Sequence, residues 1–366
     1  MSTRARFVVF SVFGALIVAM ATWVVPTLAT EPDRGPLDPI SATLADKPAP
    51  DQASEKASDT VQLVFAGDIM LDDLPGAQIA KGVDPFAEFA KIFQAADAAI
   101  GNLECAVATK GEPADKKYAF RADPQVLTVL ARHLRNVSLA NNHSLDYGQE
   151  AFLEQLELLP KHKISWFGGG RNCAEARQPL ILTLKGIRIA LLGYNNFMPR
   201  SFEAGPSWPG TAWAVNQQIF ADIRAAREIH HADLVIPFMH WGDEFDPAND
   251  DQKKLARRMI DNGADVVVGG HPHVTQGAEY YKGKLIVYSL GNFVFDGFEP
   301  GPGREGWLLR LTLDRRGLVS WDTVVAHIDD LGIPHLAADV ASPAGTAGSK
   351  VIEERKADLN SAHENP

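Results

Sequence analysis

The sequence predicts an α/β fold in which two mixed β-sheets pack together and helices cover their outer faces. Three observations lead to this expectation. Apolar, strand-like runs alternate with helical patterns over residues 61–268, hairpin patterns occur in the middle and at the end, and polar clusters follow several runs. Alternation favours parallel strands joined by helices, whereas hairpins add antiparallel strands. We therefore expect one compact domain over residues 61–330.

Five apolar runs are expected to be strands, and each ends at a short polar cluster. The runs are residues 61–66, 98–100, 137–140, 234–239 and 266–268, and the clusters are residues 67–68, 101–104, 141–143, 240–244 and 270–273. In α/β sheets, ligand sites gather outside the carboxyl ends of the strands. The five clusters therefore mark the expected functional site.

Helical spacing predicts helices between these strands, and turn residues predict the remaining strands. The helices are expected at residues 85–95, 124–134, 149–159, 215–230 and 251–262, with Pro160 and Gly263 ending the third and the fifth. A further strand is expected at residues 164–167. Hairpins are expected across Lys185-Gly186, Lys282-Gly283 and residues 315–317.

The composition sets broad limits on function. The chain has 366 residues, of which 46% are hydrophobic, so it can bury one large core or two modest ones. Its formal net charge of −11 argues against nucleic acid as a partner, because such binding needs a basic face. The two cysteines, Cys105 and Cys173, either form one bridge or stay free. Low apolar content predicts a disordered linker over residues 31–60 and a disordered tail over residues 331–366.

The N-terminal segment, residues 1–30, has the pattern of a membrane signal. Arg4 and Arg6 precede a strongly apolar stretch over residues 7–25, whose length fits a spanning helix of ~20 residues. We expect an uncleaved single-pass anchor in the cytoplasmic membrane, with the globular domain extracytoplasmic. The alternative is a cleaved signal peptide, because residues 27–29 resemble a cleavage site, and the protein is then secreted or periplasmic.

The clusters carry the ligand types of a divalent metal site. The candidate ligands offer carboxylate, carboxamide and imidazole groups, and they are Asp68, Glu104, Asn142, His240, His271 and His273. Oxygen and nitrogen ligands without thiolates suit one or two ions of Mn, Fe or Zn. In an extended segment, His271 and His273 point to the same side, so both rings can face one ion. Taken singly, each of these residues could instead be a turn or capping residue.

A catalytic role is expected for a neighbouring histidine. Two ions ~3.5–4 Å apart would activate water and clamp an anionic oxygen. His143, next to Asn142, is then placed to donate a proton to a leaving group. We also expect Asn102 and Asn141 to contact the substrate, and Arg121 to clamp an anion.

Eight segments resemble the CapA family of bacterial poly-γ-glutamate capsule proteins, itself similar to the calcineurin-like metallophosphoesterases. They are residues 65–70, 101–104, 120–124, 138–148, 168–172, 240–244, 270–273 and 289–293. The resemblance implies a four-layer α-β-β-α sandwich. It also implies a membrane-anchored protein that serves synthesis or export of poly-γ-glutamate or a related anionic polymer, beside other capsule-synthesis membrane subunits.

The resemblance also implies a role for each matching residue. Asp68 matches the first metal-ligand aspartate of the phosphoesterases, and Asn142 and His143 match their asparagine ligand and catalytic histidine. The matches to the later histidine ligands are His240, His271 and His273.

The chain departs from these patterns at three places. Met70 stands where the phosphoesterases have a histidine, and Asn102 stands where they have the bridging aspartate, so Glu104 is the candidate for that carboxylate. Asp72-Asp73 stands where CapA-like sequences commonly carry arginine. Two alternatives to a capsule-polymer role with a metal site therefore stay open: a metal-dependent hydrolase of a phosphoester or cell-envelope amide, and a non-catalytic polymer-binding module.

Overall fold

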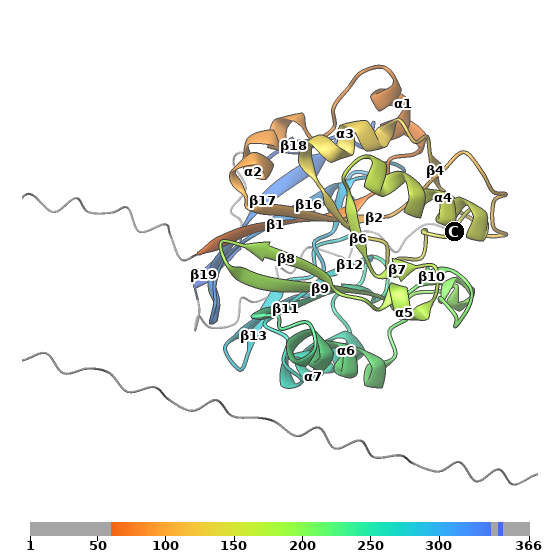
Figure 1. The fold of residues 1–366 in the computed structure, drawn as a ribbon. Helices are drawn as coiled ribbons and strands as arrows, with labels where there is room; N and C mark the ends of the chain where they lie inside the picture. The colour runs from red at the N-terminus through yellow and green to blue at the C-terminus, as the bar shows by residue number, and fades with distance from the viewer. Residues whose placement is uncertain (1–59, 338–342, 347–366) are drawn as a thin grey trace, which may run out of the picture. The chain divides into compact units, whose positions relative to one another are not determined.

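The structure, a computed structural model, describes residues 60–337 and 343–346, all within one compact unit (Figure 1). The predicted membrane segment over residues 1–30 lies outside the described residues, as does nearly all of the predicted linker. Among the helices within the described ranges, none is long and apolar enough to cross a membrane.

One mixed sheet contains nine of the described strands. Its main path in spatial order is β18 (Pro334–Leu336), β17 (Gly317–Ile328), β16 (Glu305–Asp314), β1 (Val61–Ile69), β2 (Ala98–Leu103), β5 (Asn136–Ser138) and β6 (Ser165–Phe167). Two short strands lie off this path, β15 (Asn292–Val294) beside β1 and β19 (Ala344–Thr346) beside β17. Strands β1, β2, β5 and β6 run parallel to one another. Strands β16, β17 and β18 are added to this group antiparallel, each to its neighbour.

The second mixed sheet contains six strands. Their spatial order is β13 (Ala278–Tyr281), β14 (Lys284–Val287), β12 (Val266–Gly270), β11 (Leu234–His240), β9 (Ile187–Asn195) and β8 (Leu180–Leu184). The four central strands are parallel, and hairpins add β8 and β13 as antiparallel edges. All three expected hairpins form, including β16 with β17.

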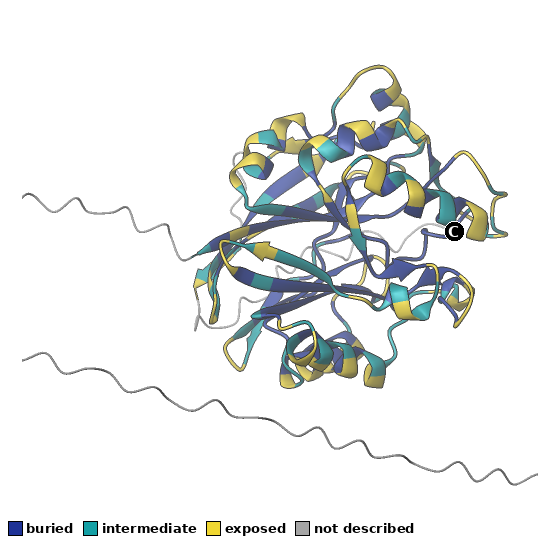
Figure 2. Cartoon of the chain, viewed as in Figure 1, coloured by how far each residue is buried: buried dark blue, intermediate teal, exposed yellow. Residues whose placement is uncertain are grey.

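The two sheets face each other across an apolar core, and helices cover both outer faces. Between the sheets, Phe65 of β1 meets Phe238 of β11 edge to face with ring centroids 6.0 Å apart. The helices over the first sheet are α1 (Asp73–Ala80), α2 (Ala90–Ala95), α3 (Val126–His133) and α4 (Gly148–Lys161), and those over the second are α6 (Asn216–Glu228) and α7 (Asp250–Asp261). Figure 2 shows buried residues along both sheets and exposed residues on the outer sides of the helices. The expected mixed sheets with helices outside are confirmed, in four layers.

Short elements complete the fold. They are β3 (Ala106–Val107) paired with β4 (Arg121–Ala122), β7 (Gly169–Gly170) paired with β10 (Gly210–Thr211), α5 (Cys173–Ala176), and the 3₁₀ turns η1 (Ala87–Phe89), η2 (Arg200–Phe202) and η3 (Pro302–Arg304). Both cysteines are free, so the bridge does not form.

Helix α1 is not among the helices expected from the sequence, and it contains Pro75 and Gly76, two residue types that disfavour a helix. Pro75 lies in the first turn, where its missing N–H needs no partner within the helix. Gly76 packs so closely that a Cβ there would lie 2.6 Å from the carbonyl oxygen of Leu71. Close packing thus overrides the local preference at this helix.

Two other segments differ from the sequence expectation. Helix α4 continues past Pro160 to Lys161, because a proline this near the helix end disturbs only the last turn. Strands β18 and β19 lie within residues 331–366, where a disordered tail was expected. Both pair with β17, which satisfies backbone groups on that long strand.

The contact between Phe65 and Phe238 should be a major source of stability. Phe238→Ala should lower the free energy of unfolding by about 3–5 kcal/mol, because it opens a cavity between the sheets. Val319→Ala, at an exposed position of β17, is the control and should change it by less than about 0.5 kcal/mol. Urea unfolding of both variants measures the difference, and equal effects would contradict this packing.

Candidate metal centre

The carboxyl ends of strands from both sheets meet at one buried site. Asp68 lies near the end of β1, and Glu104 directly follows β2. His240 is the last residue of β11, and the next strand of that sheet ends in Gly270. A Cβ at Gly270 would lie 2.6 Å from Asp68 Oδ1, so glycine lets the two sheets come this close.

Two carboxylates form the anionic part of the site. Asp68 and Glu104 are both completely buried. Asn102 Nδ2 donates a hydrogen bond to Asp68 Oδ1 at 2.8 Å, and the His271 backbone N–H donates to Asp68 Oδ2 at 3.0 Å. Burial raises the pKa of Asp68. Burial, reinforced by the charge of Asp68, raises the pKa of Glu104 well above its ordinary value.

Three histidines surround these carboxylates. His240 Nε2 lies 2.6 Å from Asn142 Oδ1 and 3.4 Å from Glu104 Oε1. The ring of His271 lies beside it, tilted by 53°, with ring centroids 4.6 Å apart. Burial is the main cause that holds the pKa of both His240 and His271 well below the usual range, and repulsion by neighbouring histidines adds to it. Both rings are therefore neutral near pH 7.

The third histidine is held by an asparagine. His273 Nδ1 contacts Asn292 Oδ1 at 2.8 Å and lies 3.8 Å from Asp68 Oδ2. Asn292 Nδ2 in turn donates to the carbonyl of Gly303 at 2.8 Å. The amide of Asn292 therefore fixes the orientation of the imidazole ring.

Buried polar atoms without partners show that the residues fit a cation. Both ring nitrogens of His271 and Glu104 Oε1 have no hydrogen-bond partner among the described residues. Two ligand sets each have donor atoms within 4.8 Å of one another: Glu104, His271 and His273, and Asp68, Glu104 and His240. Buried polar groups without partners are costly, and a divalent cation would satisfy these. The donor set of neutral imidazoles and carboxylates suits Mn, Fe or Zn.

The backbone at these histidines is also unusual. His271 has φ of 95° and His273 has φ of 58°, a region that residues other than glycine seldom adopt. Such conformations cost free energy and persist where the surroundings enforce them, often at ligand sites. The segment after β12 is therefore held in a conformation that aims both rings into the cluster, not in the extended one expected from the sequence.

His143 lies beside the cluster in a second network. Its Nδ1 contacts Asp146 Oδ2 at 2.6 Å. Lys116 Nζ donates to Asp146 Oδ1 and to the carbonyl of Asn142, both at 2.7 Å. Burial lowers the pKa of His143, although Asp146 opposes that shift. The ring of Phe120 packs on His143 with centroids 4.6 Å apart.

Sequence reasoning gave no role to three of these residues. Asp146 lies in the segment 138–148 and three positions after His143, a spacing that could have drawn attention to it. Asn292 lies in the segment 289–293, which also carried the resemblance. Lys116 gave no signal, because it lies in an irregular loop that only the tertiary fold brings to His143.

Asn102 and Asn141, which were predicted to contact the substrate, form hydrogen bonds within the protein. Asn141 Nδ2 donates to Asn102 Oδ1 at 3.0 Å and to the carbonyl of Leu103 at 2.9 Å. The His143 backbone N–H donates to Asn141 Oδ1 at 3.0 Å. Asn102 and Asn141 thus hold Asp68 and His143 in position, and contact with a substrate stays a prediction for both.

Arg121 lies apart from the metal-ligand cluster. Its guanidinium donates to the carbonyls of Lys110 and Gly111 at 3.1 and 3.0 Å and stacks 4.2 Å from the ring centroid of Tyr147. Asp72 accepts a hydrogen bond from the Arg121 backbone N–H. The guanidinium of Arg121, predicted to clamp an anion, is therefore bound to backbone carbonyls of a neighbouring loop. The cationic side chain that lies beside His143 is Lys116.

The structure shows the surroundings of Met70 and Asn102, the two residues that differ from the phosphoesterase pattern. Met70 is completely buried in the core beneath the helices of the first sheet. Asn102 Nδ2 lies 3.1 Å from His240 Nδ1 as well as beside Asp68. An amide at this position contributes no charge, so Glu104 is the second carboxylate of the site.

Comparison with protein families gives a match that covers most of the described residues. The family model described as bacterial capsule synthesis protein PGA_cap matches residues 62–297. This range contains every candidate ligand and His143.

Three curated relatives are similar over long stretches. The PGA biosynthesis protein CapA of Bacillus subtilis is 34% identical over 258 residues, which are 69% of this chain and 65% of that protein. The capsule biosynthesis protein CapA of Bacillus anthracis is 28% identical over 337 residues, which are 86% of this chain and 74% of that protein. A probable polyglutamine synthesis accessory protein of Mycobacterium tuberculosis is 32% identical over 234 residues, 60% of each chain. The chain thus spans less than two thirds of the length of two of these relatives.

Solved structures give more distant likenesses. A hypothetical protein from Thermus thermophilus has a TM-score of 0.48 at 15% identity, over 72% of this chain and 98% of its own. A novel phosphatase from Mycoplasma pneumoniae has a TM-score of 0.47 at 14% identity, over 74% of this chain and 95% of its own. These likenesses are too remote to assign a function.

The buried carboxylates predict a pH dependence for protein freed of metal by a chelator. Because the folded-state pKa of Glu104 is raised, its contribution to stability is fully present at low pH and is lost as pH rises. Glu104→Gln removes this loss, so the variant should gain stability relative to wild type between about pH 5 and pH 8. Urea unfolding at several pH values measures the difference.

The exposed Glu112 supplies the matched control. Glu112→Gln should track the wild type at every pH, because that side chain is in contact with solvent. If the stability difference between Glu104→Gln and wild type stays constant over this pH range, the pKa of Glu104 is not raised in the folded protein, and the prediction is wrong.

Proposed function

The chain belongs to the bacterial capsule synthesis protein family PGA_cap, and from this premise we propose that it serves synthesis or export of an anionic capsule polymer. Poly-γ-glutamate is the polymer that the resemblance of the sequence favours. The observation that carries the proposal is the family match over residues 62–297, which encloses the whole buried cluster. The proposal includes a membrane anchor in residues 1–30, an extracytoplasmic domain and partner subunits of a capsule-synthesis system.

The proposal also includes one or two divalent ions of Mn, Fe or Zn at the strand ends. The residues that would hold them are Asp68, Glu104, Asn142, His240, His271 and His273. A bound divalent ion supplies Lewis-acid chemistry at an anionic oxygen. The neutral state of His240 and His271, caused by burial, is the state in which imidazole binds a metal.

The protein's own residues are arranged for proton transfer beside that centre. Asp146 engages Nδ1 of His143 at 2.6 Å, which leaves Nε2 as the nitrogen available to a ligand. Lys116 fixes Asp146 from the other side, so the carboxylate cannot turn away. His143 would donate the proton to a leaving group, as a general acid.

This arrangement favours a second candidate, a metal-dependent hydrolase that acts on a phosphoester or a cell-envelope amide. The specific observation is the network of His143, Asp146 and Lys116, because a site that only holds polymer has no need of an oriented imidazole. A non-catalytic polymer-binding module is the remaining alternative. In that case the cations toward the polymer would be the metal and Lys116.

Metal content is the first test of the proposal. The purified full-length chain should contain about one or two divalent ions by elemental analysis. His271→Ala should lose most of this metal, because both of its ring nitrogens lack any other partner. His327→Ala changes an exposed histidine of β17 and should leave the metal content as in wild type. A metal-free wild type, or equal metal in His271→Ala and wild type, would refute the metal centre.

Surface polymer is the second test. Deleting the gene in the source cell should lower surface anionic polymer, and the wild-type gene should restore it. Unchanged polymer in the deletion strain would contradict the capsule role.

His143→Ala separates the two mechanisms, because the variant keeps all the metal ligands. If the site is catalytic, the variant should hold metal as the wild type does and fail to restore the polymer. Full restoration by His143→Ala with normal metal content would favour polymer binding without turnover.

A further inference from the structure

A cleft of about 580 Å³ is lined by none of the candidate metal ligands. It is formed by an excursion of the chain between β9 and α6, residues 196–215. The excursion starts at the metal centre, where the Asn196 N–H donates to the carbonyl of His240 at 2.8 Å and Phe197 packs on His271 with centroids 3.9 Å apart. It returns where Trp213 pairs with Asn195, the last residue of β9.

The cleft presents one preformed aromatic surface. Trp208 is 47% exposed, although exposing a large apolar ring is costly. Its ring lies against Gly205, where a Cβ would come within 1.9 Å of the indole, and its Nε1 donates to the carbonyl of Glu203. Glycine is therefore required at this position, and the indole is fixed with much of its surface open to the cleft.

A second indole and a guanidinium also line the cleft. Trp213 is half-buried, and the guanidinium of Arg200 lies 5.6 Å from its ring centroid. Polar side chains of Gln218 and Ser201 complete the wall.

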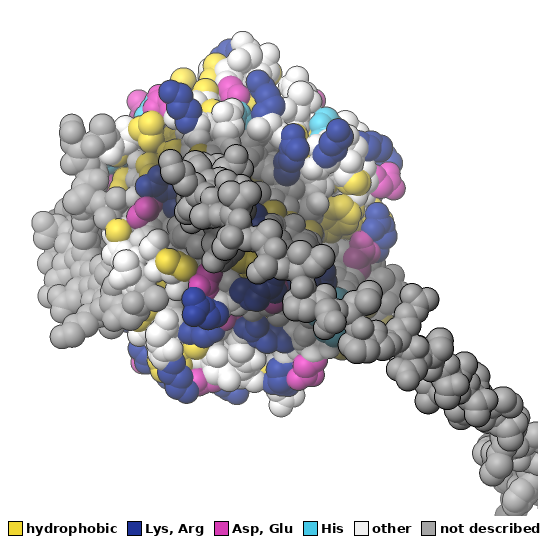
Figure 3. Space-filling model, turned by 60° about the vertical axis from the view of Figure 1, so that its left-hand side comes forward, with side chains coloured by type: hydrophobic (Ala, Val, Ile, Leu, Met, Phe, Trp, Pro, Cys, Tyr) yellow, Lys and Arg dark blue, Asp and Glu magenta, His cyan; other side chains and the backbone are white. Residues whose placement is uncertain are grey.

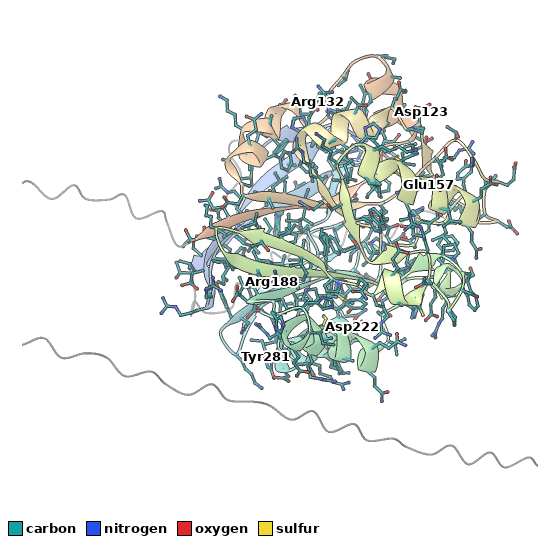
Figure 4. All side chains as sticks on the ribbon, viewed as in Figure 1. Asp123, Arg132, Glu157, Arg188, Asp222 and Tyr281 are labelled. Atoms are coloured by element: carbon teal, nitrogen blue, oxygen red, sulfur yellow. The ribbon has the colours of Figure 1, made fainter. Side chains whose placement is uncertain are left out.

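Both cationic side chains of the cleft are already paired with carboxylates. Arg200 Nε lies 2.9 Å from Glu203 Oε2. Arg177 binds Asp222 of α6 through two hydrogen bonds of 2.9 and 2.6 Å (Asp222 is labelled in Figure 4). Figure 3 shows another face of the molecule, on which basic and acidic side chains are interspersed where grey atoms do not cover them. An acidic polymer would need unpaired cations, so this cleft is not suited to one.

We propose that the cleft binds a neutral saccharide. The C–H groups of a sugar ring carry partial positive charge and pack on the electron-rich face of an indole, which Trp208 and Trp213 provide. Paired arginines and carboxylates, together with Gln218, offer donors and acceptors to hydroxyl groups without adding net charge. The volume is in the range of small-ligand sites.

This site goes beyond the proposed polymer role and does not depend on it. The same excursion of the chain contacts the metal centre at its start, where Phe197 packs on His271. Saccharide binding should nevertheless survive loss of the metal, because none of the cleft residues is a metal ligand.

The test titrates the full-length protein with three neutral trisaccharides: maltotriose, cellotriose and tri-N-acetylchitotriose. Calorimetry and indole fluorescence report binding. At least one trisaccharide should bind, and Trp208→Ala should weaken that binding by about tenfold or more. Trp208→Phe keeps an aromatic face and should retain part of the affinity. Ile229→Ala, at an exposed position after α6, is the control and should bind as wild type does.

Three outcomes would overturn the proposal. The first is no binding of any of the trisaccharides at about 10 mM. The second is binding that Trp208→Ala and Trp208→Phe leave unchanged. The third is binding of a poly-γ-glutamate oligomer, in place of the sugars, that depends on Trp208. Circular dichroism and urea unfolding confirm that the Trp208 variants are folded. His271→Ala separates this site from the metal centre because it should still bind the sugar.

Discussion

The constraint on which the site depends is the burial of two carboxylates beside each other without enough positive charge to balance them. Asp68 and Glu104 are completely buried, and burial also holds the pKa of His240 and His271 well below the usual range, so these two rings are neutral near pH 7. Among the described residues, Glu104 Oε1 and both ring nitrogens of His271 have no hydrogen-bond partner. Free energy lost through desolvation would be recovered by one compact cation that all these atoms can reach. We therefore interpret the cluster as a metal centre.

The two-sheet architecture is what makes that concentration of polar groups possible. Strands of both sheets end at the same place, and small residues let them approach: a Cβ at Gly67 would lie 2.0 Å from the carbonyl oxygen of Gly291. The surrounding amides then fix the ligands, with Asn102 on Asp68 and Asn292 on His273. The network around His143 adjoins the candidate ligands, because Lys116 donates a hydrogen bond to the carbonyl of Asn142 as well as to Asp146.

The sequence predicted the strands and most of the polar residues that the structure brings together at their ends, because apolar runs and the polar residues that end them are local signals. Residues 234–239 and His240 are an example, since β11 ends at that histidine. Features set by tertiary packing were missed. Lys116 reaches His143 from an irregular loop, and the guanidinium of Arg121 is bound to its own loop. Helix α1 was hidden by Pro75 and Gly76, which the packed structure accepts. The backbone conformation of His271 and His273 follows from the meeting of the two sheets, which no local pattern reports.

X-ray absorption at the metal edge of the purified full-length protein tests the central claim most directly. We predict a transition metal with mixed oxygen and nitrogen ligands at about 2.0–2.2 Å and outer scattering from imidazole carbons. That imidazole signal should weaken in His273→Ala. A spectrum of oxygen ligands alone, or one that His273→Ala leaves unchanged, would contradict a metal centre built from the strand-end histidines.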